Sequence, residues 1–442
     1  MLWLLKRFSL FVLALASVCL LVWLVLVLIN LRDEAPSEIT QRYLSMDWDR
    51  AVLLEEDNAV EFFAGLDAAR NVEPRELGHD WFAWANVASD QEVSGPQGPG
   101  LQEYQNLKPL MRACALPRPD CQAMLEGPDA PNLQQQLFAA QWAVQRYARL
   151  LEYSHWREPG PQRYDVILDY TTPVQLSTLY RLHALQVSRQ GDLPSSLALL
   201  DRDVRFWRLK LAQSSHLLGR MIAHAMLLHN LHWTHAVLQQ SGASLPEHSS
   251  WRSPMTEDEL SGSRGYVGEM TSMRASMDIS RSSSNQTLTD RILALLGRSL
   301  FKPVATLNLY AAHFHQAEQA MRQPLDTLPE TLARLQLQRV DEQAGWQIYN
   351  PIGAHHASQS HAQDFLRYAV RVSDLEGLRK MLLLADQLRS ETIDNADRAR
   401  WIEQSSLRNP YTEMPFDWNP DAAMLSFDGL SERDPELLRL GL

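Results

Sequence analysis

The stretch HLLGRMIAHAMLLHNLHWTHAVL, from His216 to Leu238, determines what kind of fold the chain can adopt. It has the length of one helix, and its apolar residues lie on every side of a helical wheel. A helix without a polar face belongs in a protein core, because each of its sides would otherwise expose apolar surface to water. We therefore expect a central helix here, enclosed by other helices in a mostly all-α protein.

The same stretch raises the question of a metal site, because it holds five of the fourteen histidines of the chain. His224 and His235 fall within about 20° of each other on the wheel. A zinc site needs a further ligand from elsewhere, for which the candidates are His313, His315 and Glu318, or else His355, His356 and His361. Nothing in the sequence joins these residues to the histidine-rich stretch, and no HExxH motif is present. We predict histidines buried against other helices, with no metal and no cofactor, and keep a metal site as the alternative.

An apolar run near the N-terminus predicts a transmembrane anchor. Phe8 to Ile29 contains no charged residue, and at ~1.5 Å per residue a helix of this length crosses the ~30 Å hydrocarbon core of a bilayer. Lys6 and Arg7 precede the run, and Asp33 and Glu34 follow it. Because cytoplasmic flanks are enriched in Lys and Arg, we expect the N-terminus in the cytoplasm and the following chain in the periplasm.

The alternative is a cleaved signal peptide, since Ala14 to Ala16 resembles a small-residue cleavage site. However, the residues after Ser17 stay apolar or Cys through Val27. The apolar region of a secretion signal is shorter and does not continue beyond its own cleavage site. An uncleaved inner-membrane anchor, embedded in the lipid bilayer, is therefore the prediction.

Two of the three cysteines, Cys114 and Cys121, lie close together in CALPRPDC. Outside the cytoplasm such a pair is a candidate disulfide bond, worth ~2.5 kcal/mol for a loop of about eight residues on the chain-entropy model. Two free thiols are the alternative. Too few ligands surround the pair for a zinc site, and the CxxC redox spacing is absent.

Charge and motifs exclude several classes of function. The formal net charge of −12 argues against a nucleic-acid partner. No Gly-rich phosphate loop, nucleotide motif or haem motif is present. SLFK (Ser299–Lys302) matches the S-x-x-K of acyl-transferring serine enzymes, but Pro303 ends the helical turn and K-T-G is absent. Carboxylate pairs such as Asp201 with Asp203 are expected on exposed faces or in first turns of helices, so no catalytic residue is predicted.

Beyond the anchor, apolar spacing predicts helices joined as hairpins. Pro173 opens one hairpin, which turns at Gly191–Asp192 and leads into the histidine-rich stretch. The last part differs, since Asn409–Leu430 alternates apolar and polar residues around Asn419, Pro420 and Asp421, which is typical of a β-hairpin. Helix starts are expected at Asn132 and at two capping boxes, Thr256 with Glu259 and Ser373 with Glu376.

The predicted organisation has five parts. They are a cytoplasmic tail (1–7), a transmembrane anchor (8–31), an N-terminal helical region with the cysteine loop (32–130), a helical-hairpin domain (131–408) with a mobile Ser-rich loop near 278–287, and a C-terminal β-hairpin clasp and tail (409–442).

Four stretches carry a resemblance: DNAVEFFAGLDA, RFWRLKLAQSSHLLGRMIAHAMLLHNL, KPVATLNLYA and NPYTEMPFDWNPDAAMLSFDGL. Together they resemble a group of single-pass, helix-rich inner-membrane proteins of Gram-negative proteobacteria that has no assigned function. The resemblance implies a periplasmic helical domain and transfers no functional residue.

Two hypotheses for function follow. The first is a non-enzymatic binding or scaffold component of the cell envelope that holds a protein partner in a groove between helices. The second is a periplasmic metal-dependent or hydrolytic enzyme that uses the cluster His313, His315 and Glu318. Convergence of that cluster with His224 or His235 around a pocket would favour the enzyme, and an apolar groove would favour binding.

Overall fold

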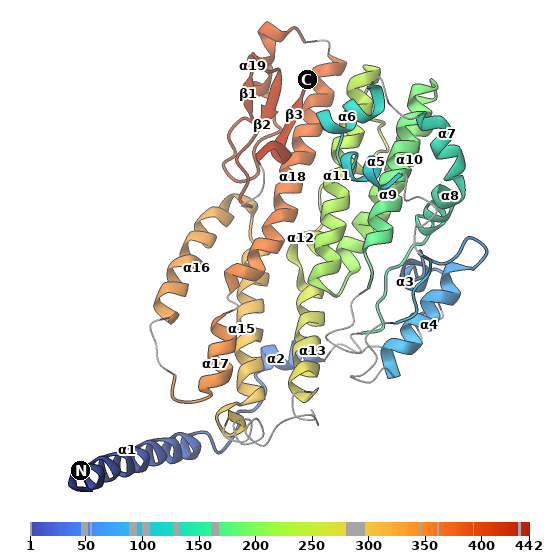
Figure 1. Cartoon of the computed structure of the whole chain (residues 1–442). Helices are drawn as coiled ribbons and strands as arrows, with labels where there is room; N and C mark the ends of the chain where they lie inside the picture. Colours follow the sequence, from blue (N-terminus) through green and yellow to red (C-terminus); the bar gives the residue numbers. More distant parts are fainter. Residues whose placement is uncertain are drawn as a thin grey trace. The chain divides into compact units, whose positions relative to one another are not determined.

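The computed structural model describes residues 2–45, 52–53, 55–87, 95–99, 107–127, 132–160, 168–279, 297–343, 347–359, 362–391, 393–431 and 435–442. They form mainly α-helices and one small antiparallel sheet, which confirms the predicted fold class (Figure 1). The chain divides into two compact units, and the domain boundaries expected from the sequence stay predictions. Unit 1 comprises Met1–Met46, Met273–Ala317 and Thr331–Phe365, and unit 2 comprises Asp47–Ser272, Glu318–Glu330 and Leu366–Leu442.

Unit 1 contains the apolar N-terminal helix α1 (Leu2–Ile29). Its segment Lys6–Ile29 has a mean hydropathy of 3.1 and stands clear of the rest of the chain, so it fits a membrane span or a secretion signal. The small core of the unit is aromatic, with the Phe314 ring 4.4 Å from Phe365 and 6.1 Å from Tyr43. Its other helices are α2 (Glu38–Leu44), α15 (Pro303–Met321) up to Ala317, α16 (Leu328–Gln343) from Thr331, and α17 (Pro351–Ser358).

The base of α1 is fastened to unit 1 by a buried asparagine. Asn30 follows the helix directly and is only 1% exposed. Its side-chain amide donates to the carbonyl of Ile348 at 3.0 Å, and its Oδ1 accepts the backbone N–H of Asn350 at 2.6 Å. The first residue beyond the apolar helix is therefore part of the folded unit.

A second contact lies three residues further along, at Asp33. The two oxygens of Asp33 accept the free backbone N–H groups of Val304 and Ala305 in the first turn of α15, at 2.9 and 3.1 Å. A carboxylate is favourable there because a helix N-terminus carries unpaired N–H groups and a partial positive charge. Asn308 of the same helix accepts the backbone N–H of Ser37 at 2.9 Å. We call these contacts of Asn30, Asp33 and Ser37 the anchor joint.

Unit 2 is built around the histidine-rich stretch, which forms α11 (Leu217–Ser241). Most of its residues up to Leu238 are buried, as expected for a central helix, although Leu218 is 38% exposed. The surrounding helices are α3 (Val60–Ala64), α4 (Pro74–Val87), α5 (Lys108–Ala113), α6 (Pro119–Glu126), α7 (Leu133–Ala139), α8 (Gln141–Leu150), α9 (Thr171–Arg189), α10 (Leu193–Gln213), α12 (Glu257–Ser261), α13 (Ser263–Ile279) up to Ser272, α18 (Ala362–Ser390) from Leu366, and α19 (Asn395–Gln404).

The predicted hairpin is formed by α9 and α10, which pack on each other and on α11. Gly191 has φ +92° in the turn, a backbone conformation that residues with a Cβ atom rarely adopt. Asp192 then caps α10 by accepting the backbone N–H of Ser195 at 3.1 Å. The hairpin was predictable because both signals are local.

Of the expected helix starts, the first capping box is confirmed, since Thr256 and Glu259 cap α12 reciprocally. Asn132 caps α7, but the helix breaks at Ala140. The second box is wrong: Ser373 and Glu376 lie inside the 29-residue α18. The expected Ser-rich loop near 278–287 lies outside the described residues, apart from 278 and 279, which still belong to α13.

The C-terminal hairpin is present and gains a third strand. β1 (Asp417–Asn419) pairs antiparallel with β2 (Met424–Ser426), and β2 pairs with β3 (Arg439–Gly441). The Phe427 ring packs so closely on Gly377 of α18 that a Cβ there would lie 2.4 Å from it. The Tyr411 hydroxyl donates to Asp374 of α18 at 2.6 Å. The sheet therefore packs on α18.

Candidate functional site

The residues proposed for a metal site are divided between the two units. His313 and His315 lie on the part of α15 that belongs to unit 1, and His224, His235 and Glu318 belong to unit 2. Across the ranges that the structure describes, no group of three His, Cys, Asp or Glu side chains is arranged to hold a metal ion.

Among the candidates for the metal site, Glu318 and His315 contact other side chains, and His224 is buried. Glu318 pairs with Arg322 at 2.9 Å and accepts the Ser263 hydroxyl at 3.1 Å. The Nδ1 atom of His315 lies 3.3 Å from the Arg42 guanidinium. His224 is buried beside a cavity of only about 10 Å³.

Two histidines of α11 hold the C-terminal segment. The Nε2 atom of His235 hydrogen-bonds the carbonyl of Gly441 at 2.7 Å, and that of His232 hydrogen-bonds the carbonyl of Leu437 at 3.1 Å. Burial, together with the nearby Arg389 and His232, lowers the pKa of His235 to about 3. Burial likewise lowers the pKa of His232 to about 4. Both rings are therefore neutral at pH 7 and donate from Nε2.

The cysteine pair is joined, as its spacing suggested. A disulfide links Cys114 at the end of α5 to Cys121 in α6. The indole N–H of Trp233 in α11 donates to the carbonyl of Cys114 at 3.3 Å. The disulfide loop is thereby connected to the central helix of unit 2.

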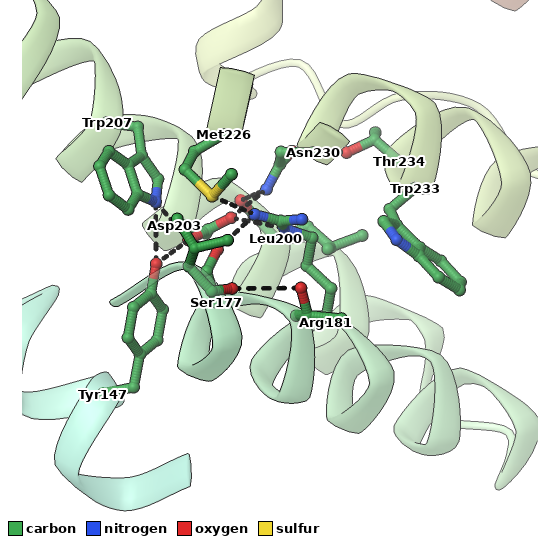
Figure 2. Close-up of polar contacts among 12 residues, drawn as sticks. Tyr147, Ser177, Arg181, Leu200, Asp203, Trp207, Met226, Asn230, Trp233 and Thr234 are labelled. Carbon is green, nitrogen blue, oxygen red and sulfur yellow. Dashed lines mark hydrogen bonds and ion pairs between the residues drawn. The ribbon is translucent and has the colours of Figure 1, made fainter. Parts of the chain in front are cut away.

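Behind α10 lies a buried polar network centred on Asp203, which is 0% exposed (Figure 2). Its Oδ1 accepts the Tyr147 hydroxyl at 2.6 Å and the Trp207 indole N–H at 3.0 Å. Its Oδ2 accepts the guanidinium of Arg181 at 3.2 Å and the amide of Asn230 at 2.9 Å. The charge is paired with a cation that is itself 0% exposed, and both carboxylate oxygens are hydrogen-bonded.

This location corrects the expectation from the sequence, in which Asp201 and Asp203 formed one exposed acidic pair. Residues two apart on a helix point about 200° apart. Asp201 lies toward the solvent side of α10, with its side chain 16% exposed, whereas Asp203 lies in the core.

The network reaches a groove on the outside of α10. The Asn230 amide donates to Asp203, and its oxygen accepts the indole N–H of Trp251 at 3.3 Å and the hydroxyl of Thr234 at 3.0 Å. Trp251 and Thr234 line a cavity of about 300 Å³, which we call the α10 groove. It is lined by Pro194, Leu197, Ala198, Leu200, Asp201, Arg202, Arg205, Thr234, Leu245, Pro246, His248, Ser249 and Trp251.

One wall of the groove runs from Leu245 to Trp251, as irregular backbone that ends in a short 3-10 helix (Ser250–Arg252), and carboxylates hold it in place. Asp386 of α18 accepts the backbone N–H of Leu245 at 2.6 Å, and Asp201 of α10 accepts that of Ser250 at 2.7 Å. Arg252 pairs with Asp386 at 3.0 Å. The groove is therefore preformed, since both its floor and its wall are tied to helices.

The rim of the groove is basic. Arg202, Arg205 and His248 are exposed along it. Asp201 is the acidic lining residue, and its Oδ2 lies 3.3 Å from the guanidinium of Arg205. Arg202 has no ion-pair partner within the described parts of the chain.

A second buried charge, Lys210, lies two turns further along α10. It is 0% exposed, and its Nζ lies 3.3 Å from the ring centroid of Trp156 and 5.0 and 5.2 Å from those of Phe63 and Tyr170. Nζ has no hydrogen-bond partner among the described residues. Burial lowers the pKa of Lys210 to about 7, and Glu158 opposes that shift. We call Lys210 and its three rings the lysine box.

Glu158 supports the lysine box from one side. Burial raises the pKa of Glu158, but His216, Lys210 and hydrogen bonds overcome this effect and hold it below its usual value. Its oxygens accept the Trp156 indole N–H at 2.9 Å and the backbone N–H of Ser215 at 2.7 Å. The carboxylate is therefore charged and fixes the indole that covers Lys210.

The sequence offered only faint signals for these features. Lys210 and Asp203 lie seven residues apart on one face of α10, among Val204, Trp207 and Leu211. A charged residue at an apolar position of a helix is a signal for a buried charge. The sequence does not indicate its partners, because Trp156 and Arg181 come from other segments.

No family model, curated protein or solved structure matches the chain. The resemblance to single-pass proteobacterial proteins stays an expectation.

Proposed function

We propose that the chain is a membrane-anchored helical protein whose folded part lies in the periplasm, where it serves as a non-enzymatic binding or scaffold component of the cell envelope. The anchor joint carries this proposal. The α10 groove supports the binding role.

The anchor joint favours a retained anchor over a cleaved signal. A signal peptide is removed, so a mature fold makes no use of its end. Here Asn30, one residue beyond α1, is 1% exposed and bonded to Asn350. Cleavage after Ala16 would also leave Ser17–Ile29, which is entirely apolar apart from its first residue, attached to the folded unit.

The topology follows from charge and redox chemistry. Lys6 and Arg7 precede the apolar helix, which favours a cytoplasmic N-terminus. The disulfide between Cys114 and Cys121 agrees with a periplasmic location for unit 2, because such bonds persist in oxidising compartments.

The binding role is supported by the α10 groove. Leu197, Leu245 and Trp251 give it an apolar lining, and charged groups lie at its rim. Preformed apolar clefts with a few placed polar groups are the usual form of binding sites.

The full chain, produced in a Gram-negative inner membrane, tests the anchor. We expect an intact mass that includes residues 1–16, retention in the membrane after carbonate extraction, and an active alkaline phosphatase fused after Leu442. A mature chain that begins after Ala16, or an inactive fusion together with a fluorescent cytoplasmic reporter, contradicts the proposal.

The binding role is tested with a photo-crosslinking amino acid placed at Ala198 in the groove. We expect a discrete crosslinked partner band from living cells. The matched control carries the same amino acid at Phe138, which is 77% exposed and does not line the groove. Absence of a band specific to position 198 contradicts a binding role for this surface.

A further inference from the structure

We propose that the α10 groove binds an acidic segment of a partner protein, with an apolar side chain seated against Pro194, Leu197 and Ala198 and neighbouring carboxylates paired with Arg202 and Arg205. This inference rests on the proposed binding function and specifies the chemistry of the partner.

The size of the groove selects a side chain or two rather than a large ligand. Its volume is about 300 Å³, at the lower end of the ~300–1,000 Å³ typical of small-molecule sites. On the α10 side its apolar lining is Pro194, Leu197 and Ala198, of which Pro194 and Ala198 are exposed. Such a lining accepts an aliphatic or aromatic side chain, and an extended peptide presents alternate side chains to a surface.

The charge of the rim selects the residues beside that side chain. Both oxygens of Asp201 are already engaged, one by the backbone N–H of Ser250 and the other by Arg205. Arg202 is exposed on the same rim without an ion pair among the described residues. The rim is thus locally positive on a chain of net charge −12, so a segment with carboxylates is attracted there and a basic segment is repelled.

The buried network lowers the cost of binding. Trp251 is held through Asn230 to Asp203, and Leu245 is held by Asp386. A wall and floor that are already ordered lose little conformational freedom when a segment enters.

The experiment measures fluorescence anisotropy of the full chain in detergent micelles with two pools of labelled octapeptides. Both pools have leucine or aromatic residues at the two central positions. One pool has glutamate and the other has lysine at the flanking positions. We expect saturable binding of the glutamate pool and at least ~10-fold weaker binding of the lysine pool, as electrostatic complementarity requires.

Substitutions test whether the peptides bind in the α10 groove. Arg202→Glu should raise the Kd for the glutamate pool about five- to tenfold, and the matched control Arg400→Glu, on an exposed position of α19 outside the groove, should leave it unchanged. Ala198→Phe, at an exposed position of α10, fills the groove and should abolish binding of the pool. Circular dichroism and melting of each variant confirm that it is folded.

Equal binding of both pools, no binding of either, or unchanged binding by Ala198→Phe overturns this inference. Vesicles of phosphatidylglycerol that compete with the glutamate pool only in the unfilled protein would assign the groove to lipid, and would also overturn it. None of these outcomes depends on anchor retention, and a crosslinked partner at position 198 with no preference for the glutamate pool would leave the proposed function intact.

Discussion

Asp203 and Lys210 lie two turns apart on one face of α10, both are 0% exposed, and the fold accommodates their charges in opposite ways. Asp203 has a buried countercharge on Arg181 and hydrogen bonds to both oxygens. The ammonium of Lys210 faces three aromatic rings and has the carboxylate of Glu158 nearby, but it has no hydrogen bond within the described residues.

The difference shows what each charge requires of its surroundings. A carboxylate needs donors, so Asp203 draws side chains from α8, α9, α10 and α11 into one network. The faces of aromatic rings stabilise an ammonium without any hydrogen bond. They compensate the loss of water around Lys210 less well than hydrogen bonds compensate that around Asp203, so the pKa of Lys210 falls to about 7. Removal of each charge should therefore have different consequences.

The largest expected effect comes from Asp203→Ala. It leaves Arg181 buried without its countercharge, which should destabilise the protein by ~3–5 kcal/mol. Urea unfolding of the full chain in detergent, followed by tryptophan fluorescence, measures the loss. The matched control is Asp201→Ala, which removes a partly exposed carboxylate from the same helix and should cost about 1 kcal/mol or less. Similar losses in the two variants would show that the network adds no special stability.

An intermediate effect is expected for His235, a third buried group, which stays neutral. Its folded pKa of about 3 lies below the unfolded value of ~6.5, so below pH 6.5 the unfolded state binds more protons. Its contribution is complete above about pH 6.5 and should fall by at most ~2 kcal/mol by pH 5. His235→Gln, which keeps a donor for Gly441, should flatten this acid slope, and added zinc should change nothing. An unaltered slope in the variant would assign the acid sensitivity to other groups.

The smallest effect at neutral pH is expected for Lys210→Met, about 1 kcal/mol or less, because a pKa near 7 leaves Lys210 only partly charged there, and Glu158 keeps its hydrogen bonds from Trp156 and Ser215. The sign of the pH dependence is more informative. Between about pH 7 and the unfolded value of ~10.4, the unfolded wild type binds more protons than the folded one. The stability of the wild type relative to Lys210→Met should therefore rise from pH 7 to pH 9. A flat difference would mean that Lys210 stays fully charged in its box.

Local patterns predicted much of this architecture. The apolar N-terminal helix, the α9–α10 hairpin, the central α11 and the close pair Cys114 and Cys121 are all marked by neighbouring residues. Each of these features depends on spacing along one segment, which a sequence displays directly.

Features that depend on distant segments were missed. Asp203 was expected to be exposed because carboxylates usually are, and its partners Tyr147 and Arg181 come from other helices. The capping box at Ser373 failed because Glu376 pairs with Arg379 and accepts the backbone N–H of Met255 instead. No spacing rule brings such groups together, since packing alone decides which segments meet.

The anchor joint has a consequence for the order in which the chain folds. Asp33 and Val304 lie 271 residues apart in sequence, so at ~5–20 residues per second the ribosome needs roughly 15–50 s to supply the second after the first. The helices α9 and α10 follow each other directly in the sequence, so their hairpin is complete long before that. Helix α1 is thus synthesised well before α15, and Asn30 and Asp33 stay hydrated until the residues that cover them, from Val304 to Asn350, have followed.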